Sequence, residues 1–255
     1  MLSRERERER SCVGSGVRHW LKRWVDYGET YGPHVVERFL IQCRSAETVL
    51  DIGAGGGRDL GVARRIFPGA ETLALECYPP NIELLTAAGC RTYQFDLERE
   101  SFPFAAESID IIIANQILEH TKELFWIVHE MTRTLRVGGH LLIGVPNVAS
   151  LHNRIGLLFG RHPTQAKACS AHVRCFSRND FLLFLQEGFP GGYELRDFAG
   201  SQFYPFPRAV ARRLSACFPA AAFSIFFLLR KTRPYGDSFL QYPRAAHLET
   251  NFKLE

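Results

Sequence analysis

The chain has 255 residues, of which 46% are hydrophobic, and this is enough to bury the core of one α/β domain. Its net charge of +4 comes from 31 basic and 27 acidic side chains spread along the chain, so the charge does not indicate a nucleic-acid partner. The seven cysteines form no C-x-x-C pair, and no secretory signal pattern is visible. Both features favour reduced thiols in a cytoplasmic protein.

Composition divides the chain into three segments. Residues 1–18 include an alternating Arg/Glu run without an apolar face, which predicts a disordered charged tail. Residues 19–233 are predicted to form the folded domain. Residues 234–255 are expected to be a loosely attached C-terminal tail.

Apolar runs alternate with amphipathic segments in the order typical of a doubly wound, mostly parallel sheet of Rossmann-like type, with helices on both faces. Strands are expected at 49–52, 72–75, 91–95, 109–114, 141–145, 193–199 and 223–229. Helices are expected after Gly57 and after Pro79-Pro80. A basic linker with Arg208, Arg212 and Arg213 is expected between the last two strands.

Two further helices are expected in the second half. One places Leu124, Ile127, Val128, Met131 and Leu135 on one face and ends at Gly138-Gly139. The other follows Ser177, which forms a capping box with Asp180.

Residues 148–175 do not have the pattern of a simple crossover connection between two strands. They contain a short amphipathic helix with Leu151, Ile155 and Leu158, followed by Gly160, Pro163 and a polar stretch. An insertion at this point lies over the carboxyl ends of the strands, where ligands bind in this architecture. We therefore expect a substrate lid.

The most informative feature is an aliphatic strand that runs into a glycine turn, Val-Leu-Asp-Ile-Gly-Ala-Gly-Gly-Gly from Val49 to Gly57. Glycines at 53, 55 and 57 let the backbone come close to a ligand, and a helix that starts at Gly57 points its positive end to the same place. The carboxylate of Asp51 would repel a pyrophosphate but attract an ammonium or a sulfonium group. S-adenosylmethionine carries both cations.

The following strand ends offer the groups that an adenosyl ligand needs. Glu76 lies nineteen positions after Gly57, close to the spacing at which a carboxylate meets ribose hydroxyls. Asp96 could accept from the adenine amino group. The complete predicted cofactor set is Asp51, Gly53, Ala54, Gly55, Gly57, Glu76, Cys77, Asp96, Leu97, Asn115 and Gln116.

These motifs resemble those of class I S-adenosylmethionine-dependent methyltransferases over residues 27–231. The Gln-x-Leu-Glu-His form at 116–120 is similar to the branch that contains quinone-biosynthesis O-methyltransferases and many small-molecule or glycan methyltransferases. Residues 146–176 are similar to the lid of that branch. The resemblance implies seven strands with the last one antiparallel, a methyltransferase domain at 19–233, and methylation of a small molecule or glycan at oxygen.

Such a reaction needs an aligned nucleophile and, for a hydroxyl, a proton acceptor. His120 is the first candidate because it follows the fourth strand on the ligand side, and His172 in the lid is the second. Arg154 and Arg174 could bind an anionic group of the substrate. His162, Cys169, His172 and Cys175 have no standard zinc spacing, so no metal is expected.

Two other functions stay open at this stage. A nicotinamide-dependent oxidoreductase is disfavoured because its fingerprint needs glycine where Arg58 stands. The other alternative is a cofactor-binding partner subunit without catalysis. The apolar stretch 217–229, preceded by arginines, is too short to span a bilayer but could touch a membrane that carries a lipid-linked acceptor.

Overall fold

The computed structural model describes residues 25–248, so the predicted charged tail at 1–18 lies outside the described residues. Seven strands form one sheet in the order β3-β2-β1-β4-β5-β7-β6. The strands are β1 (Thr48–Ile52), β2 (Glu71–Glu76), β3 (Arg91–Gln94), β4 (Ile109–Asn115), β5 (Leu135–Pro146), β6 (Tyr193–Ser201) and β7 (Ser224–Lys231). All seven predicted strands are confirmed.

Only β7 runs against its neighbours. The pairs β3-β2, β2-β1, β1-β4 and β4-β5 are parallel, whereas β7 pairs antiparallel with both β5 and β6. The sheet is therefore Rossmann-like with an antiparallel last strand, as the resemblance implied.

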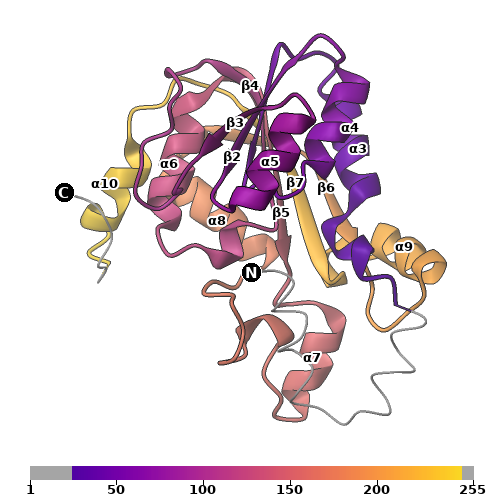
Figure 1. Ribbon diagram of the computed structural model, residues 1–255. Coiled ribbons are helices and arrows are strands. Elements are labelled where there is room, and N and C mark those ends of the chain that lie inside the picture. The colour runs from indigo at the N-terminus through magenta and orange to yellow at the C-terminus, as the bar shows by residue number, and fades with distance from the viewer. Residues whose placement is uncertain (1–24, 249–255) are drawn as a thin grey trace.

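Helices cover both faces of the sheet (Figure 1). The α-helices are α3 (Pro33–Gln42), α4 (Arg58–Ile66), α5 (Pro79–Ala87), α6 (Leu124–Thr134), α7 (Leu151–Leu158), α8 (Arg178–Gly188), α9 (Arg208–Cys217) and α10 (Ser238–Ala245). Short 3-10 helices are η1 (Tyr27–Tyr31), η2 (Leu118–His120), η3 (Thr164–Ala166) and η4 (Pro219–Ala221). The predicted cap of α8 is confirmed, since the Ser177 side chain accepts from the Asp180 amide.

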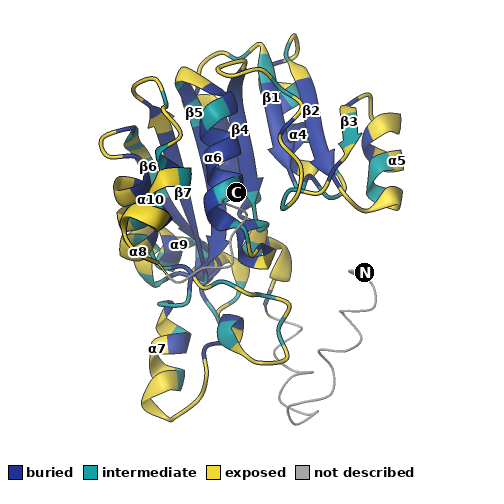
Figure 2. Ribbon diagram, turned by 90° about the vertical axis from the view of Figure 1, so that its left-hand side faces the viewer, coloured by how far each residue is buried: buried dark blue, intermediate teal, exposed yellow. Residues whose placement is uncertain are grey.

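The core has two layers because side chains of a strand alternate between the faces of the sheet. In β5, Leu141 and Ile143 pack with the side that carries α6, α8 and α10, whereas Leu142 packs with the side that carries α3 and α4. Figure 2 shows the strands as a buried layer and α7 as a largely exposed projection.

The boundary between α6 and β5 differs from the prediction. The helix was expected to continue through Leu135 to Gly138-Gly139, but it ends at Thr134, and Leu135 already pairs with Ile109 of β4. A register irregularity follows between Ile109 and Ile111. Leu135 faces the core in either conformation, so its apolar character could not distinguish a last helical turn from the start of a strand.

The segment between the last two strands is also different. Residues 208–217 form the helix α9 instead of a linker, because Arg208 and Arg212 both reach the buried carboxylate of Glu29. Burial tends to raise the pKa of Glu29, but hydrogen bonding and charge from Arg212 and the other cations lower it below its ordinary value. The arginines at 208, 212 and 213 alone favour a basic linker, because the sequence does not show that Glu29 lies beside them.

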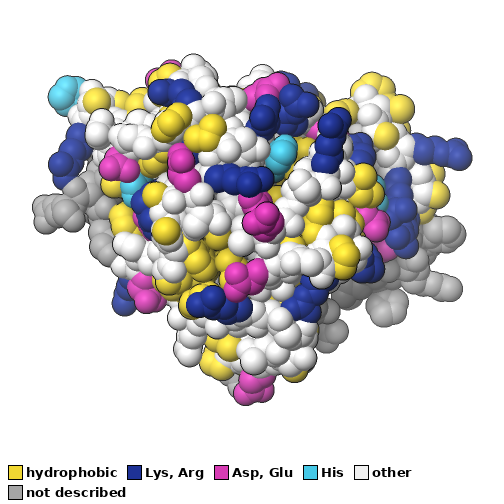
Figure 3. All heavy atoms as spheres, turned by 90° about the horizontal axis from the view of Figure 1, so that it is seen from above, with side chains coloured by type: hydrophobic (Ala, Val, Ile, Leu, Met, Phe, Trp, Pro, Cys, Tyr) yellow, Lys and Arg dark blue, Asp and Glu magenta, His cyan; other side chains and the backbone are white. Residues whose placement is uncertain are grey.

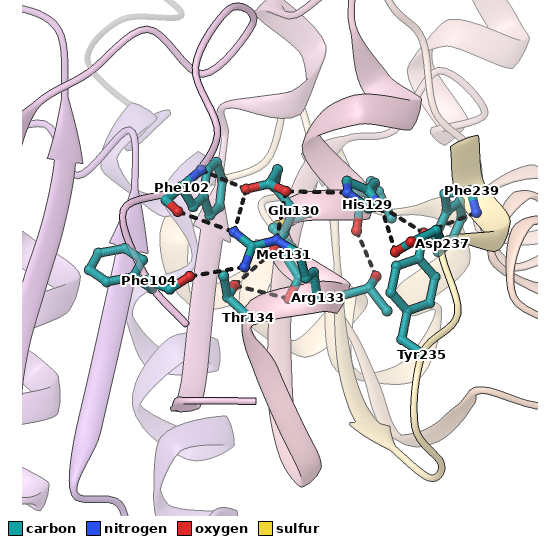
Figure 4. A network of polar contacts seen from close by, with 12 residues as sticks. Phe102, Phe104, His129, Glu130, Met131, Arg133, Thr134, Tyr235, Asp237 and Phe239 are labelled. Atoms are coloured by element: carbon teal, nitrogen blue, oxygen red, sulfur yellow. Dashed lines mark hydrogen bonds and ion pairs between the residues drawn. The ribbon is translucent and has the colours of Figure 1, made fainter. Parts of the chain in front are cut away.

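The segment from Pro234 is not a loosely attached tail over its described part. Helix α10 packs against α6 and α8, and Phe239 is fully buried. Figure 4 shows the polar side of this junction, where the Tyr235 hydroxyl lies 3.0 Å from His129 Nδ1 and accepts from the Phe239 amide. His129 also contacts Glu130, which binds Arg133.

This docking predicts that Phe239→Ala lowers the free energy of unfolding by about 3–5 kcal/mol, the usual cost of emptying a buried aromatic site. Gln241→Ala is the matched control, because Gln241 lies on the exposed side of the same helix. Urea unfolding of both variants measures the difference. Equal midpoints for the two variants would show that α10 does not hold the domain together.

Candidate active site

The predicted cofactor groups meet at the carboxyl edge of the sheet, beside the point where the strand order reverses. Strands β2 and β4 flank β1 on its two sides, so the loops after β1 and β4 diverge there, which is where ligands bind in open α/β sheets. The Gly53 amide donates to the Leu75 carbonyl at 2.8 Å, which ties the glycine turn to the end of β2.

The glycine turn depends on glycine at each predicted position. Gly53, Gly55 and Gly57 all have positive φ, at 67°, 54° and 76°. A Cβ at Gly53 would collide with Ile117, and one at Gly57 with Leu85. A Cβ at Gly55 would meet no atom of the described residues within 4 Å, so the space over Gly55 is open for a ligand.

Asp51 lies beneath this turn with 3% of its surface exposed. Burial is the main reason that its pKa lies well above the ordinary value, and the nearby charges of Asp59 and Glu76 raise it further, against the opposing effect of Arg58. Two carboxylates and one guanidinium therefore act on the charge of Asp51. Such a site gains by receiving a cation.

The loop itself already holds Glu76. One carboxylate oxygen accepts from the Gly55 amide at 2.7 Å, and the other accepts from the amides of Cys77 and Tyr78, each at 2.9 Å. The Asn81 side-chain amide also donates to the first oxygen, at 3.3 Å, so four contacts fix the carboxylate at the end of β2. A carboxylate at this strand end is the group that meets ribose hydroxyls in Rossmann-type sites.

The N-terminal segment reaches the start of α4 and the end of β4, a contact that sequence reasoning missed. The Arg58 guanidinium lies 4.7 Å from the centre of the Tyr31 ring and 2.9 Å from Asp59 Oδ1. The Asn115 side-chain amide donates to the Tyr31 carbonyl at 3.0 Å and to Asp59 Oδ2 at 2.7 Å. Asn115, the last residue of β4, thus joins η1 to α4.

Other predicted cofactor residues lie at the rim. Asp96 is half exposed and accepts from the Glu98 amide at 3.0 Å, and Leu97 packs against the core. Gln116 has a positive φ of 57°, and its buried Nε2 finds no hydrogen-bond partner among the described residues. A strained backbone with an unsatisfied amide is typical of a ligand contact.

The two predicted histidines lie against each other. The rings of His120 and His172 are 4.8 Å apart in an edge-to-face arrangement, although 51 residues of sequence lie between them. The Glu119 carbonyl accepts from the amides of Val173 and Arg174 at 2.8 and 3.2 Å, and this pairing brings the lid to η2. Burial, with the nearby His120, lowers the pKa of His172 to about 4.

The two ends of the insertion 148–175 lie side by side. Asn147 forms a β-bridge with Phe176, and the Val148 amide donates to the Phe176 carbonyl. The predicted apolar stripe of α7 does not pack inward: Leu158 is 83% exposed and the adjacent Phe159 78%. Arg154 Nε donates to the Ala149 carbonyl at 2.6 Å, and Arg174 donates to the Lys122 carbonyl. Both arginines are thus engaged with backbone of this region.

The opposite edge of the sheet has a different character. A shallow hollow there is lined by Thr48, Glu71 and Arg91 at the amino ends of β1, β2 and β3, remote from the glycine turn. Basic and acidic side chains are interspersed on this end of the molecule (Figure 3). Among the residues that the structure describes, no helix is long and apolar enough to cross a membrane.

Comparisons with known proteins agree with this geometry. A family model described as a methyltransferase domain matches residues 50–143, which run from the glycine motif through most of β5. Malonyl-[acyl-carrier protein] O-methyltransferase from Methylococcus capsulatus is 32% identical over 210 residues, covering 81% of this chain and 68% of the relative.

Solved structures share the fold at lower identity. A methyltransferase in complex with the Haloferax volcanii Trm112 methyltransferase activator has a TM-score of 0.59 at 15% identity, covering 86% of this chain and 97% of that one. The 1,6-didemethyltoxoflavin-N1-methyltransferase of Burkholderia thailandensis, solved with S-adenosylhomocysteine, has a TM-score of 0.54 at 16% identity, covering 82% and 80%. These findings set aside the nicotinamide-dependent alternative. The chain belongs to the class I methyltransferases, and it is an enzyme that uses S-adenosylmethionine.

Proposed function

We propose that the enzyme methylates a hydroxyl oxygen of a small molecule or a glycan. The observation that carries this proposal is the pair formed by His120 and His172 at the carboxyl end of β4, on the same edge as the glycine turn. A hydroxyl acceptor must lose its proton when it attacks the methyl group, and neutral imidazole can take part in that step. The low pKa of His172 keeps that ring neutral at pH 7.

The cofactor would lie across the ends of β1, β2 and β4. In this arrangement Asp51 faces the positive charge of the methionine part, and Glu76 accepts from the ribose. Asp96 with Leu97 would receive the adenine. Gly53, Ala54, Gly55, Gly57, Cys77, Asn115 and Gln116 supply the close backbone and the remaining rim contacts.

The lid favours an acceptor with an apolar part. Leu158 and Phe159 project from α7 into solvent, together with the half-exposed Ile155. The sequence left membrane contact by 217–229 open as an alternative to a buried strand. Since Arg208 and Arg212 bind Glu29, α7 is the better surface for a lipid-linked acceptor. The acceptor itself is sought by incubating candidate hydroxyl compounds with methyl-labelled S-adenosylmethionine and locating the label by mass spectrometry. Label on nitrogen or carbon alone would contradict transfer to oxygen.

Replacement of Asp51 by Asn should have two opposite effects. The neutral amide loses the attraction for the cationic cofactor, which predicts about 10- to 100-fold weaker binding. The same change should stabilise the ligand-free protein, because a carboxyl group whose pKa is raised by folding costs stability at any pH above its unfolded pKa. Calorimetric titration and thermal unfolding measure the two effects.

Cofactor affinity should also depend on pH through the protonation of Asp51. As the pH falls, protonation of Asp51 removes the charge that attracts the cofactor, so affinity should fall in the wild type and stay flat in Asp51→Asn. Glu83→Gln, which removes an exposed carboxylate on α5, is the charge-matched control. Unchanged affinity in Asp51→Asn would remove Asp51 from the site.

Gly55→Val should abolish cofactor binding in a protein that still folds. The surrounding residues leave room for the side chain, and the positive φ costs on the order of 1–2 kcal/mol, but the valine occupies the space assigned to the ligand. Gly61→Ala in α4 is the control. A Cβ at Gly61 also meets no atom of the described residues within 4 Å, and Gly61 does not have a positive φ. Normal binding by Gly55→Val would show that the cofactor lies elsewhere.

His120→Ala should lower turnover by about 10²- to 10⁴-fold while the cofactor still binds, since the residue acts on the acceptor side of the reaction. His162→Ala, which changes a lid histidine outside the pair, should retain turnover. Both variants are compared in single-turnover assays after their cofactor affinity has been measured. Full activity of His120→Ala would exclude it from acceptor activation.

A further inference from the structure

Two segments that are distant in sequence bring three metal-ligating side chains together at the carboxyl end of β4. Glu119 and His120 belong to η2, and His172 comes from the lid. One ligand atom from each lies within 4.8 Å of the other two, and His120 Nε2 is 3.8 Å from Glu119 Oε1. The sequence-based zinc set at 162–175 shares only His172 with this cluster.

The cluster contains buried groups that the protein leaves unsatisfied. Glu119 is 2% exposed, and its Oε2 finds no hydrogen-bond partner among the described residues. Nδ1 of His172 is likewise buried without a partner there. A buried carboxylate oxygen without a hydrogen bond is costly, so it calls for a ligand that supplies positive charge.

The chemistry of the three groups limits the kind of cation that can bind. Two imidazoles and one carboxylate are typical of sites for zinc, iron, manganese or cobalt, whereas magnesium and calcium favour oxygen ligands. We propose that Glu119, His120 and His172 bind one divalent transition-metal cation, such as Zn²⁺, Mn²⁺ or Co²⁺. Three protein ligands leave positions open on the cation for a hydroxyl of the acceptor.

Metal binding would also bring the lid closer. Nitrogen ligands lie about 2.0–2.1 Å from zinc, so the ligand atoms around one tetrahedral ion are about 3.3 Å apart. The present separations of up to 4.8 Å are slightly wider than this. Since the lid reaches η2 through the Val173 and Arg174 amides, a small inward shift of His172 completes the site without breaking that pairing.

The consequence for catalysis rests on the proposed transfer to oxygen. The cation lowers the pKa of a bound hydroxyl, which releases its proton to water. The resulting oxygen anion forms the new bond to the methyl carbon while the carbon–sulfur bond breaks, and its electron pair stays on sulfur as a neutral thioether. The histidines then act as ligands of the cation that activates the acceptor.

The test is a direct titration of the full-length protein with Co²⁺, followed by absorbance and without cofactor or acceptor. Wild type should bind one equivalent with the spectrum of nitrogen and oxygen ligands. Glu119→Gln and His172→Ala should each weaken binding by at least about tenfold, given that even loss of an outer-sphere partner costs about 10- to 100-fold. Thermal unfolding checks that each variant is folded.

The matched control is the double variant Cys169→Ser/Cys175→Ser, which removes the thiols of the other possible lid site. It should bind Co²⁺ as tightly as wild type. A thiolate-to-cobalt band in wild type that disappears in this variant would overturn the proposal, as would equal affinity of wild type and Glu119→Gln. Methyl transfer by metal-free protein would overturn the catalytic role while leaving the proposed methylation intact.

Discussion

The site depends on a negative charge that the fold holds in an unfavourable place. Asp51 is the next-to-last residue of the buried strand β1, receives little water and lies near Asp59 and Glu76. Burial and the two carboxylates raise the free energy of ionised Asp51 in the empty protein, against the opposing effect of Arg58. In the proposed site, a cationic cofactor would remove that penalty on binding, and the fold would thereby favour S-adenosylmethionine over an anionic ligand.

The insertion 148–175 and the N-terminal segment both attach near the carboxyl end of β4. Tyr31 is held beside the start of α4 by its contact with Arg58 and by the Asn115 hydrogen bond. The Glu119 carbonyl binds the backbone of the insertion and brings His172 to His120. The last residue of β4 and the 3-10 helix after it therefore hold two segments that are distant in the sequence.

Sequence patterns predicted the sheet well because the inner strands β1, β2, β4, β5 and β7 have buried apolar runs and the glycine turn has a distinctive rhythm. The strand ends at Asp51, Glu76 and Asn115 follow directly from that order, since parallel strands bring their carboxyl ends to one edge. Whether they bind the cofactor as predicted is a matter for the variants above. The family resemblance supplied the antiparallel direction of β7, which periodicity alone does not contain.

What the sequence did not reveal are contacts between distant segments. The role of Tyr31, the buried Glu29 and the meeting of Glu119 with His172 have no local pattern, because each depends on the packing of elements far apart in the chain. The errors at Leu135, at α9 and at α10 have the same origin. In each case a tertiary partner determined the local structure. Leu135 pairs with Ile109, α9 binds Glu29, and α10 packs against α6 and α8.

The ion pair between Glu29 and Arg212 joins side chains that are 183 positions apart in the sequence. During synthesis the N-terminal segment leaves the ribosome long before α9 exists, so the clamp that anchors η1 cannot form until nearly the whole domain has been translated. A nascent chain that already has β1 and its glycine turn therefore lacks the anchor of η1. The contacts of Tyr31 with Arg58 and Asn115 gain this support only after α9 has been synthesised.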